Sequence, residues 1–264
     1  MPSDFAVVLD VAGTILKMYR VAKNIAKNIL IRKVITWELI MEKSGRALVV
    51  PQLDPEVVAA CLPKEPIGAI LNLSEIEVSC SSSPVSKAEV VGILLGSKAR
   101  IADIQEVHNE VKAKCPEKYQ TTGMIVDQDI REVTYTISTA GTPFNGFNEV
   151  LESLKYLGAE VYVASGDSIH GLLQLTDYGI LPERIFSASS PKRKQEIILM
   201  LKKKYKCVVM VGDGLNDIFA LQASDLGILT LQQDTRQAPR LFKAADVVIW
   251  DIKELPEILK GRDV

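Results

Sequence analysis

The stretch VVLDVAGTIL, from Val7 to Leu16, carries an apolar run into a single aspartate, Asp10. An apolar run without alternating polar residues is typical of a strand that is buried on both faces of a parallel sheet. Such a strand delivers the Asp10 carboxylate to the loop that follows it. Two residues later, where a neighbouring acid could stand, the sequence has Ala12. We therefore expect a reaction that uses one carboxylate at this strand end.

The composition is that of an ordinary water-soluble protein. The chain has 264 residues, of which 47% are apolar and 24% charged, which suits one large domain or two modest ones. The formal charge of -2 argues against a general nucleic-acid or membrane-surface binder. The N-terminus lacks the features of a signal peptide, and no uncharged run reaches the ~18 apolar residues of a membrane span. We expect a cytoplasmic protein with neither a nucleic-acid nor a membrane partner.

The cysteines and histidines argue against a zinc site. The four cysteines are far apart and form no C-x-x-C pair, and only His108 and His170 could complete a ligand set. Free thiols in a reducing compartment are the simpler expectation.

The second half of the sequence predicts alternating strands and helices. Strands are expected at residues 159–165, 183–189, 207–213, 226–230 and 244–250, and helices at residues 147–158, 168–179, 191–205 and 215–224. Strands joined by short helical connections form right-handed βαβ units and a parallel sheet. The strand before Asp10 has the same apolar character, so we expect it to join this sheet.

Between these parts the sequence changes character and predicts an inserted α+β unit. Residues 19–42 and 97–115 have helical patterns, whereas residues 46–50, 67–73, 75–80, 122–127 and 132–139 read as strands. An insertion of this size is within the usual range for a domain. We therefore expect it to leave the sheet just after the first strand.

Four polar segments follow predicted strand ends or begin predicted helices. They are Asp10–Thr14, Ser165–Ser168, Lys194 in the first turn of a helix, and Gly212–Asp217. Each alone is usually a cap, a turn or a solvated helix start. In an open parallel sheet, however, ligands bind beyond the carboxyl ends of the strands. All four segments in this order therefore indicate one site.

The side chains of these segments suit phosphoryl transfer. The Asp10 carboxylate can accept a phosphoryl group, and Ser165 with the neighbouring amides at a helix start can bind phosphate. Lys194 supplies positive charge for the transferred group. Asp213 and Asp217 lie four residues apart, and two carboxylates beside Asp10 require a cation. Oxygen ligands without histidine favour Mg²⁺.

These segments resemble the motifs of the haloacid dehalogenase superfamily. Asp10-x-x-Gly-Thr14 is similar to its first motif, Ser165 to its second, Lys194 to its third and Gly212–Asp217 to its fourth. The phosphorylation domain of P-type ATPases is particularly similar, because its D-K-T-G-T motif also lacks an acid two residues after the nucleophile. The stretches ASGDS and SPKRK resemble the T-G-D and P-x-x-K motifs of that branch, which selects Lys194 rather than Lys192.

The resemblance implies a fold and an activity. A Rossmann-like parallel sheet with helices on both faces would comprise residues 1–17 and 135–264, and an inserted α+β cap domain would comprise residues 18–134. The activity would be that of a Mg²⁺-dependent phosphohydrolase or phosphotransferase with a small phosphorylated substrate and an aspartyl-phosphate intermediate. The insertion has no clear nucleotide-binding motif, and the absence of membrane spans argues against a transport pump.

The resemblance also implies roles for individual residues. Asp10, the backbone carbonyl of Ala12 and Asp213 would bind the metal. The catalytic residues would be Asp10 as nucleophile, Ser165, Lys194 and Asp217, and the phosphate-binding residues would be Thr14, Gly166, Asp167 and Asn216.

Ala12 leaves the proton source open. In ordinary phosphatases of the superfamily an aspartate at this position protonates the leaving group and then activates water. Without it, the substrate could have a good leaving group, the insertion could supply an acid such as His108, or the protein could act as a non-hydrolytic phosphate- or nucleotide-responsive regulator. The stretch DVAGT also resembles phosphonoacetaldehyde hydrolases, which form a Schiff base through a cap lysine. The lysines in the corresponding region are Lys17, Lys23, Lys27 and Lys33.

Overall fold

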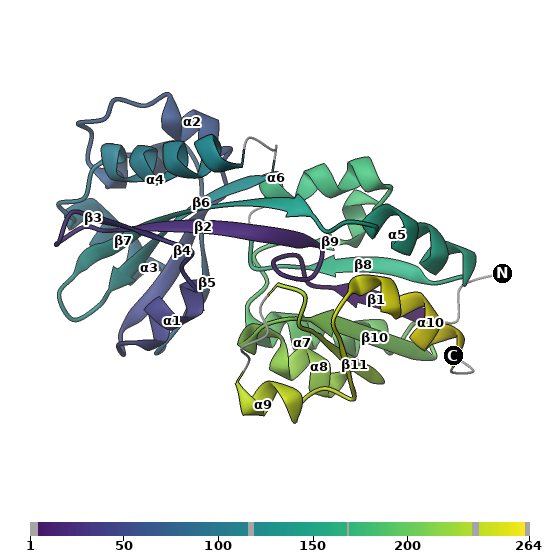
Figure 1. Cartoon of the computed structure of the whole chain (residues 1–264). Helices are drawn as coiled ribbons and strands as arrows, with labels where there is room; N and C mark the ends of the chain where they lie inside the picture. The colour runs from purple at the N-terminus through teal and green to yellow at the C-terminus, as the bar shows by residue number, and fades with distance from the viewer. Residues whose placement is uncertain (1–4, 116–118, 168, 234–237, 262–264) are drawn as a thin grey trace. The chain divides into compact units, whose positions relative to one another are not determined.

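The computed structural model describes residues 5–115, 119–167, 169–233 and 238–261, and the chain forms two compact units (Figure 1). The core unit comprises Met1–Met18, Thr142–Ser165 and Leu173–Val264, and the inserted unit comprises Tyr19–Gly141 and Gly166–Leu172. None of the helices in the described ranges is long and apolar enough to cross a lipid bilayer.

A parallel sheet forms the centre of the core unit. Its strand order is β12-β11-β10-β1-β8-β9, and every pair is parallel. The strands are β1 (Phe5–Leu9), β8 (Glu160–Ala164), β9 (Ile185–Phe186), β10 (Cys207–Gly212), β11 (Leu226–Thr230) and β12 (Val247–Ile249). All residues of β1 are buried, and β1 lies between β8 and β10. The loops that leave the carboxyl ends of these three strands are therefore neighbours.

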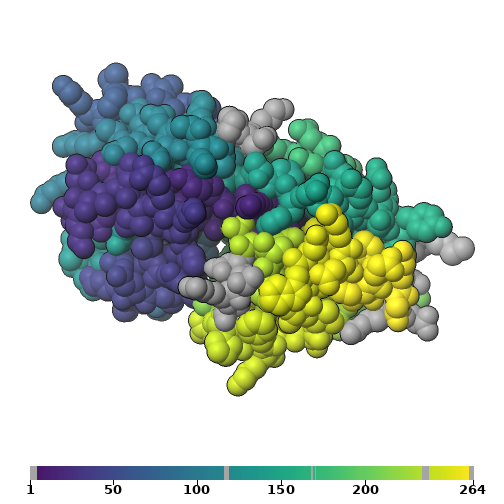
Figure 2. Space-filling view, viewed as in Figure 1, coloured from purple at the N-terminus to yellow at the C-terminus, as the bar shows by residue number. Residues whose placement is uncertain are grey.

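Helices flank this sheet. The α-helices are α5 (Phe147–Tyr156), α7 (Pro191–Leu201), α8 (Ile218–Ala223), α9 (Pro239–Phe242) and α10 (Leu255–Lys260), and the 3-10 turns are η2 (Leu173–Tyr178), η3 (Pro182–Arg184), η4 (Leu215–Asp217) and η5 (Ile252–Glu254). Apolar residues of α7, α8 and α9 pack with Ala6 and Val8 of β1. Helix α5 contacts β8 and α10, and in Figure 2 the yellow C-terminal residues lie directly against the teal α5 segment. The expected α/β class is confirmed.

The inserted unit has an antiparallel sheet with the order β3-β2-β7-β6-β4-β5. The strands are β2 (Leu16–Asn24), β3 (Ile29–Arg32), β4 (Arg46–Pro51), β5 (Ile76–Ser81), β6 (Gln120–Asp127) and β7 (Glu132–Pro143). The helices are α1 (Thr36–Met41), α2 (Pro55–Ala59), the 3-10 helix η1 (Ile67–Asn72), α3 (Lys87–Gly96), α4 (Ile101–Lys114) and α6 (Ile169–Leu172). Residues from α2, α3, α4 and η1 pack with residues of β4 and β6 in one apolar cluster.

The helix expected over residues 19–42 is wrong. This segment forms most of β2, all of β3 and, after them, the short helix α1. The adjacent residues Val21 and Ala22 are both buried, but they belong to two different apolar clusters. Only a strand directs neighbouring side chains to opposite faces. Pairing in the sheet and a turn with Asn28 at φ 51° thus override the local helical preference.

Two other expectations need correction. Residues 67–73 were expected as a strand but form η1, in which Ile67 and Ile70 bury side chains three positions apart, as a helical turn requires. The expected boundary between residues 134 and 135 falls inside β7, and the inserted unit continues to Gly141. It also includes Gly166–Leu172, which follow β8 in sequence.

A buried carboxylate organises one end of the inserted unit. The Asp127 side chain is 2% exposed and lies 2.9 Å from the Lys43 ammonium. One of its oxygens also accepts hydrogen bonds from the backbone N–H groups of Asp129 and Ile130, at 3.1 and 3.4 Å. The Arg46 guanidinium lies over the ring of Tyr135. Asp127 thereby ties the turn between β6 and β7 to the segment before β4.

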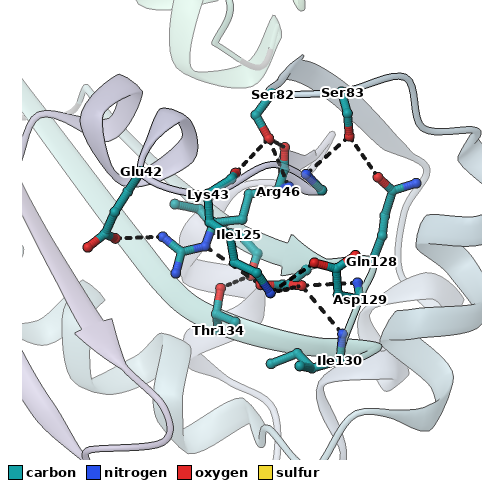
Figure 3. Close-up of polar contacts among 12 residues, drawn as sticks. Glu42, Lys43, Arg46, Ser82, Ser83, Ile125, Gln128, Asp129, Ile130 and Thr134 are labelled. Atoms are coloured by element: carbon teal, nitrogen blue, oxygen red, sulfur yellow. Dashed lines mark hydrogen bonds and ion pairs between the residues drawn. The ribbon is translucent and has the colours of Figure 1, made fainter.

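Serine hydroxyls connect this turn to the segment after β5. Ser82 donates to the carbonyl of Lys43 at 2.8 Å, and Ser83 donates to the side-chain oxygen of Gln128 at 3.0 Å. Figure 3 shows both hydroxyls directed toward these partners. All the side chains in this cluster have protein partners, so we read it as a structural junction.

We expect Asp127→Ala to lower the free energy of unfolding by about 2–3 kcal/mol, because two turn amides and an ammonium group lose a charged, buried acceptor. Urea denaturation of both proteins measures the difference. Asp129→Asn is the matched control, since the Asp129 side chain is 65% exposed and its ion pair should contribute less than about 1 kcal/mol. Equal stability of the two variants would contradict the structural role of Asp127.

Candidate active site

The loop after β1 is a tight turn that presents Asp10. The N–H groups of Thr14, Ile15 and Leu16 all donate to the carbonyl of Val11, at 3.3, 3.0 and 2.9 Å. Asp10 itself is 2% exposed. Gly13 has φ +83°, and a Cβ there would lie 1.9 Å from a carboxylate oxygen of Asp213. Position 13 must therefore be glycine, both for its backbone conformation and for the space that Asp213 occupies.

Lys194 is a fully buried cation between two carboxylates. Its Nζ lies 2.5 Å from Asp10 Oδ1 and 2.7 Å from Asp217 Oδ1, and its side chain is 0% exposed. It reaches this position from the first turn of α7, which begins after the N-cap Ser190. Burial lowers the pKa of Lys194, but the charges of Asp10 and Asp217 outweigh burial and hold the pKa above its usual value. The lysine is therefore a permanent ammonium ion.

Asp213 and Asp217 complete a group of three carboxylates with Asp10. One oxygen from each residue can be chosen so that all three lie within 4.8 Å of one another. Asp217 is held in place by the N–H of Gly214, which donates to its second oxygen at 3.1 Å. Three carboxylates carry more negative charge than one lysine neutralises, and they offer only oxygen ligands. The donor set therefore fits a hard divalent cation such as Mg²⁺.

The hydroxyl of Thr14 is available to a ligand. It is buried and finds no hydrogen-bond partner within the described part of the chain. A buried hydroxyl without a partner is costly, so such groups are usually bonded to water or a ligand. The backbone of Thr14 is fixed separately, because its carbonyl accepts a 2.6 Å hydrogen bond from Gln232. Gln232 is not among the site residues expected from the sequence, although it lies just after β11, at the carboxyl edge of the sheet.

The remaining expected site residues divide between the two units. Ser165 directly follows β8 in the core unit and is 1% exposed, and its N–H donates to the carbonyl of Phe186. Asn216 lies in η4, half-buried. Gly166 and Asp167 group with the inserted unit, where the Tyr119 hydroxyl donates to the Asp167 carboxylate. The structure thus brings Asp10, Asp213, Asp217 and Lys194 together within the core unit.

His108, the acid suggested for the inserted unit, is packed in its interior. The side chain is 1% exposed, and Nε2 lies 3.5 Å from a carboxylate oxygen of Glu56. Burial lowers the pKa of His108, and Glu56 opposes this shift only in part. A buried, neutral imidazole of this kind fits the packing role of an amphipathic helix residue.

Lys23, one of the lysines considered for a Schiff base, is occupied by two carboxylates. Its Nζ lies 2.8 Å from Asp103 and 2.5 Å from Glu106. Burial lowers its pKa, but these hydrogen bonds and charges outweigh burial and raise the pKa above its usual value. A Schiff-base lysine needs the opposite shift, toward the neutral amine.

Comparison with known proteins identifies the family. The family model for haloacid dehalogenase-like hydrolases matches residues 6–225. This chain belongs to that family. It is therefore an enzyme of the hydrolase class.

Two curated relatives show which members of the family this chain resembles. The chain is 36% identical over 257 residues to a soluble P-type ATPase-like phosphatase of Methanocaldococcus jannaschii, covering 97% of this chain and 93% of that protein. It is 24% identical over 257 residues to a copper-transporting ATPase of Helicobacter pylori. That match covers 96% of this chain but 33% of the ATPase, so the chain spans about a third of the transporter. The expected likeness to P-type ATPases is confirmed.

A solved structure supports the same fold. The catalytic domain of the CPx-ATPase CopB-B, studied for conformational changes upon nucleotide binding, matches 97% of this chain and 89% of its own length. The TM-score is 0.50 and the sequence identity is 17%, a likeness that concerns the fold alone.

We expect Lys194→Met to lower the free energy of unfolding by about 3–5 kcal/mol, because it leaves two buried carboxylates without their cation. Lys192→Met, at an exposed position in the same helix turn, should change stability by less than about 0.5 kcal/mol. Urea denaturation of both variants in metal-free buffer tests this expectation. A Lys194→Met protein as stable as the Lys192→Met control would contradict the role of the ion pair.

Proposed function

We propose that this chain is a Mg²⁺-dependent phosphohydrolase that transfers the phosphoryl group of a small phosphorylated substrate to Asp10 and then to water. The observation that carries the proposal is the buried Lys194 ammonium, which bridges Asp10 and Asp217 in a site that also contains Asp213. An ion pair that served stability alone would require neither the third carboxylate nor the unpartnered hydroxyl of Thr14.

In the first step, a carboxylate oxygen of Asp10 attacks phosphorus. The new bond joins that oxygen to phosphorus, while the bond from phosphorus to the leaving oxygen breaks. The leaving oxygen keeps the electron pair and takes a proton from solvent, since Ala12 has none to give. Lys194 and the hydroxyls of Thr14 and Ser165 stabilise the negative charge on the phosphoryl oxygens.

In the second step, a water molecule attacks the phosphorus of the aspartyl phosphate. The bond between phosphorus and the Asp10 oxygen breaks, the water proton passes to solvent, and inorganic phosphate leaves. The Asp10 carboxylate is restored. Asp217 positions the Lys194 ammonium throughout, because its Oδ1 lies 2.7 Å from the lysine Nζ.

Asp10, Asp213 and the backbone carbonyl of Ala12 would hold Mg²⁺. The ion supplies positive charge that offsets the carboxylates and the phosphoryl oxygens. Gly166, Asp167 and Asn216 are proposed as further phosphate-binding residues.

The lack of an acidic side chain at position 12 limits which substrates the site can use. General acid–base catalysis typically contributes about 10²–10⁴-fold to rate, so a site without it favours substrates whose leaving group needs no proton. Acyl phosphates and nucleotide anhydrides have such leaving groups. The same residue supports a second candidate function, a phosphate-responsive regulator that forms or binds the phosphoryl group without fast release.

We expect Asp10→Asn to reduce Mg²⁺-dependent phosphate release by at least about 10³-fold, because the amide is a poor nucleophile. Release is measured from p-nitrophenyl phosphate, acetyl phosphate and ATP, and acetyl phosphate should be turned over faster than the ester. Asp177→Asn, at an exposed position in η2, is the matched control and should retain full activity. Release that survives in Asp10→Asn would refute the mechanism.

Ala12→Asp separates the two candidate functions. If the wild type releases phosphate and Ala12→Asp extends activity to the ester, the chain is a phosphohydrolase limited by its proton source. A wild type that releases none, combined with an active Ala12→Asp variant, would support the regulator.

A further inference from the structure

Two consecutive glutamines after β11 hold the segment that contains the nucleophile loop. Gln232 donates from Nε2 to the carbonyl of Thr14 at 2.6 Å. Its other amide atom, Oε1, accepts from the N–H of Ile252 at 3.1 Å. The Gln232 amide therefore joins the nucleophile loop to the start of η5, and both of its polar ends are used.

Gln233 binds the same segment four residues later. Its Oε1 accepts from the N–H of Met18 at 2.8 Å, and its Nε2 approaches the carbonyl of Met18 at 3.4 Å. One side-chain amide thus bonds both backbone groups of one residue, as a neighbouring strand would. Met18 is the last residue of the core unit before the chain first passes into the inserted unit.

We propose that Gln232 and Gln233 act together as a clamp of positioning residues, which fixes the nucleophile loop at Thr14 and the start of β2 at Met18. The proposal rests on the proposed function in so far as it concerns phosphoryl transfer. It assigns a role to the loop after β11, which shares no residue with the expected catalytic set.

The geometry explains why the two glutamines act as one device. Thr14 and Met18 bracket only Ile15, Leu16 and Lys17, and adjacent residues of a single loop hold the two ends. This short segment also contains the end of the tight turn, in which Gly13 donates to the carbonyl of Leu16 at 2.8 Å. Releasing either end therefore loosens the same turn, and the Thr14 hydroxyl loses its fixed position.

A clamp has a kinetic signature that ordinary loop packing lacks. Misplacement of a reacting group by about 1 Å can cost on the order of 10²-fold in rate, so the loss should appear in kcat and much less in KM. Because each glutamine restrains the same segment, the second substitution should add little once the first is made.

The test uses Gln232→Met, Gln233→Met and the double variant in the full chain. Methionine keeps the length of the side chain but removes both hydrogen-bonding atoms. Gln222→Met is the matched control, since Gln222 is exposed on α8. Hydrogen exchange of the peptides covering residues 11–19 reports the clamp directly, and turnover of acetyl phosphate with Mg²⁺ gives kcat and KM.

We expect both single variants to exchange faster over residues 11–19 and to lose about tenfold in kcat with KM changed by less than about twofold. The double variant should lose much less than the product of the two single losses. Exchange and kcat equal to those of Gln222→Met, or losses that multiply, would overturn the clamp while leaving the proposed function intact. If the wild type releases no phosphate, the proposed function fails instead, and unchanged exchange over residues 11–19 would then overturn the clamp by itself.

Discussion

A buried ammonium ion held by two buried carboxylates is the interaction on which the core unit depends. Moving three charged groups out of water costs several kcal/mol for each ion, and their mutual attraction offsets this only when the geometry is good. Lys194 meets that condition, with Asp10 and Asp217 at 2.5 and 2.7 Å. An apolar triad of similar volume would stabilise a fold at least as well. The charges are therefore best explained by chemistry, for which a fixed cation beside a carboxylate is needed.

This arrangement imposes requirements on the backbone around it. A Cβ at Gly13 would lie 1.9 Å from Asp213, and one at Gly212 would lie 2.6 Å from Asp217. The two carboxylates thus approach the backbone of two different loops more closely than any side chain permits. Gly13 lies in the loop after β1 and Gly212 ends β10, and these two strands pair in parallel from Phe5–Cys207 to Leu9–Val211. The sheet sets the distance between the segments that follow its strands. The absence of a Cβ at Gly13 and Gly212 leaves room for the carboxylates of Asp213 and Asp217 within that distance.

The site was more predictable from sequence than the inserted unit, for a physical reason. Parallel strands bring all their carboxyl ends to one edge, so Asp10 and the Gly212–Asp217 segment were expected together once the strands were recognised, whereas Lys194 was chosen over Lys192 from the family resemblance. No such rule applied to residues 19–42. Val21 and Ala22 are buried in two different apolar clusters. This alternation between the two faces of a strand becomes visible only when the partner strand is known. Helix α3 was missed although Ser86 and Glu89 form a capping box before it. The glutamines after β11 follow a strand end, but their role depends on backbone groups of Thr14, Met18 and Ile252 that only the folded chain brings to them.

The lack of an acid at position 12 then constrains where a proton can come from. A general acid must reach the leaving oxygen or a water molecule bound to it, and the His108 side chain is a poor candidate because it is 1% exposed and burial lowers its pKa. Lys194 is no better donor, because its two carboxylates raise its pKa and hold its protons. What remains in the core unit is a strongly electrostatic site: a fixed ammonium, three carboxylates suited to a divalent cation, and an unpartnered hydroxyl. In the proposed mechanism, such a site would lower the barrier for forming the bond to Asp10 without assisting departure of the leaving group, so the chemistry of the leaving group would decide which phosphates are substrates.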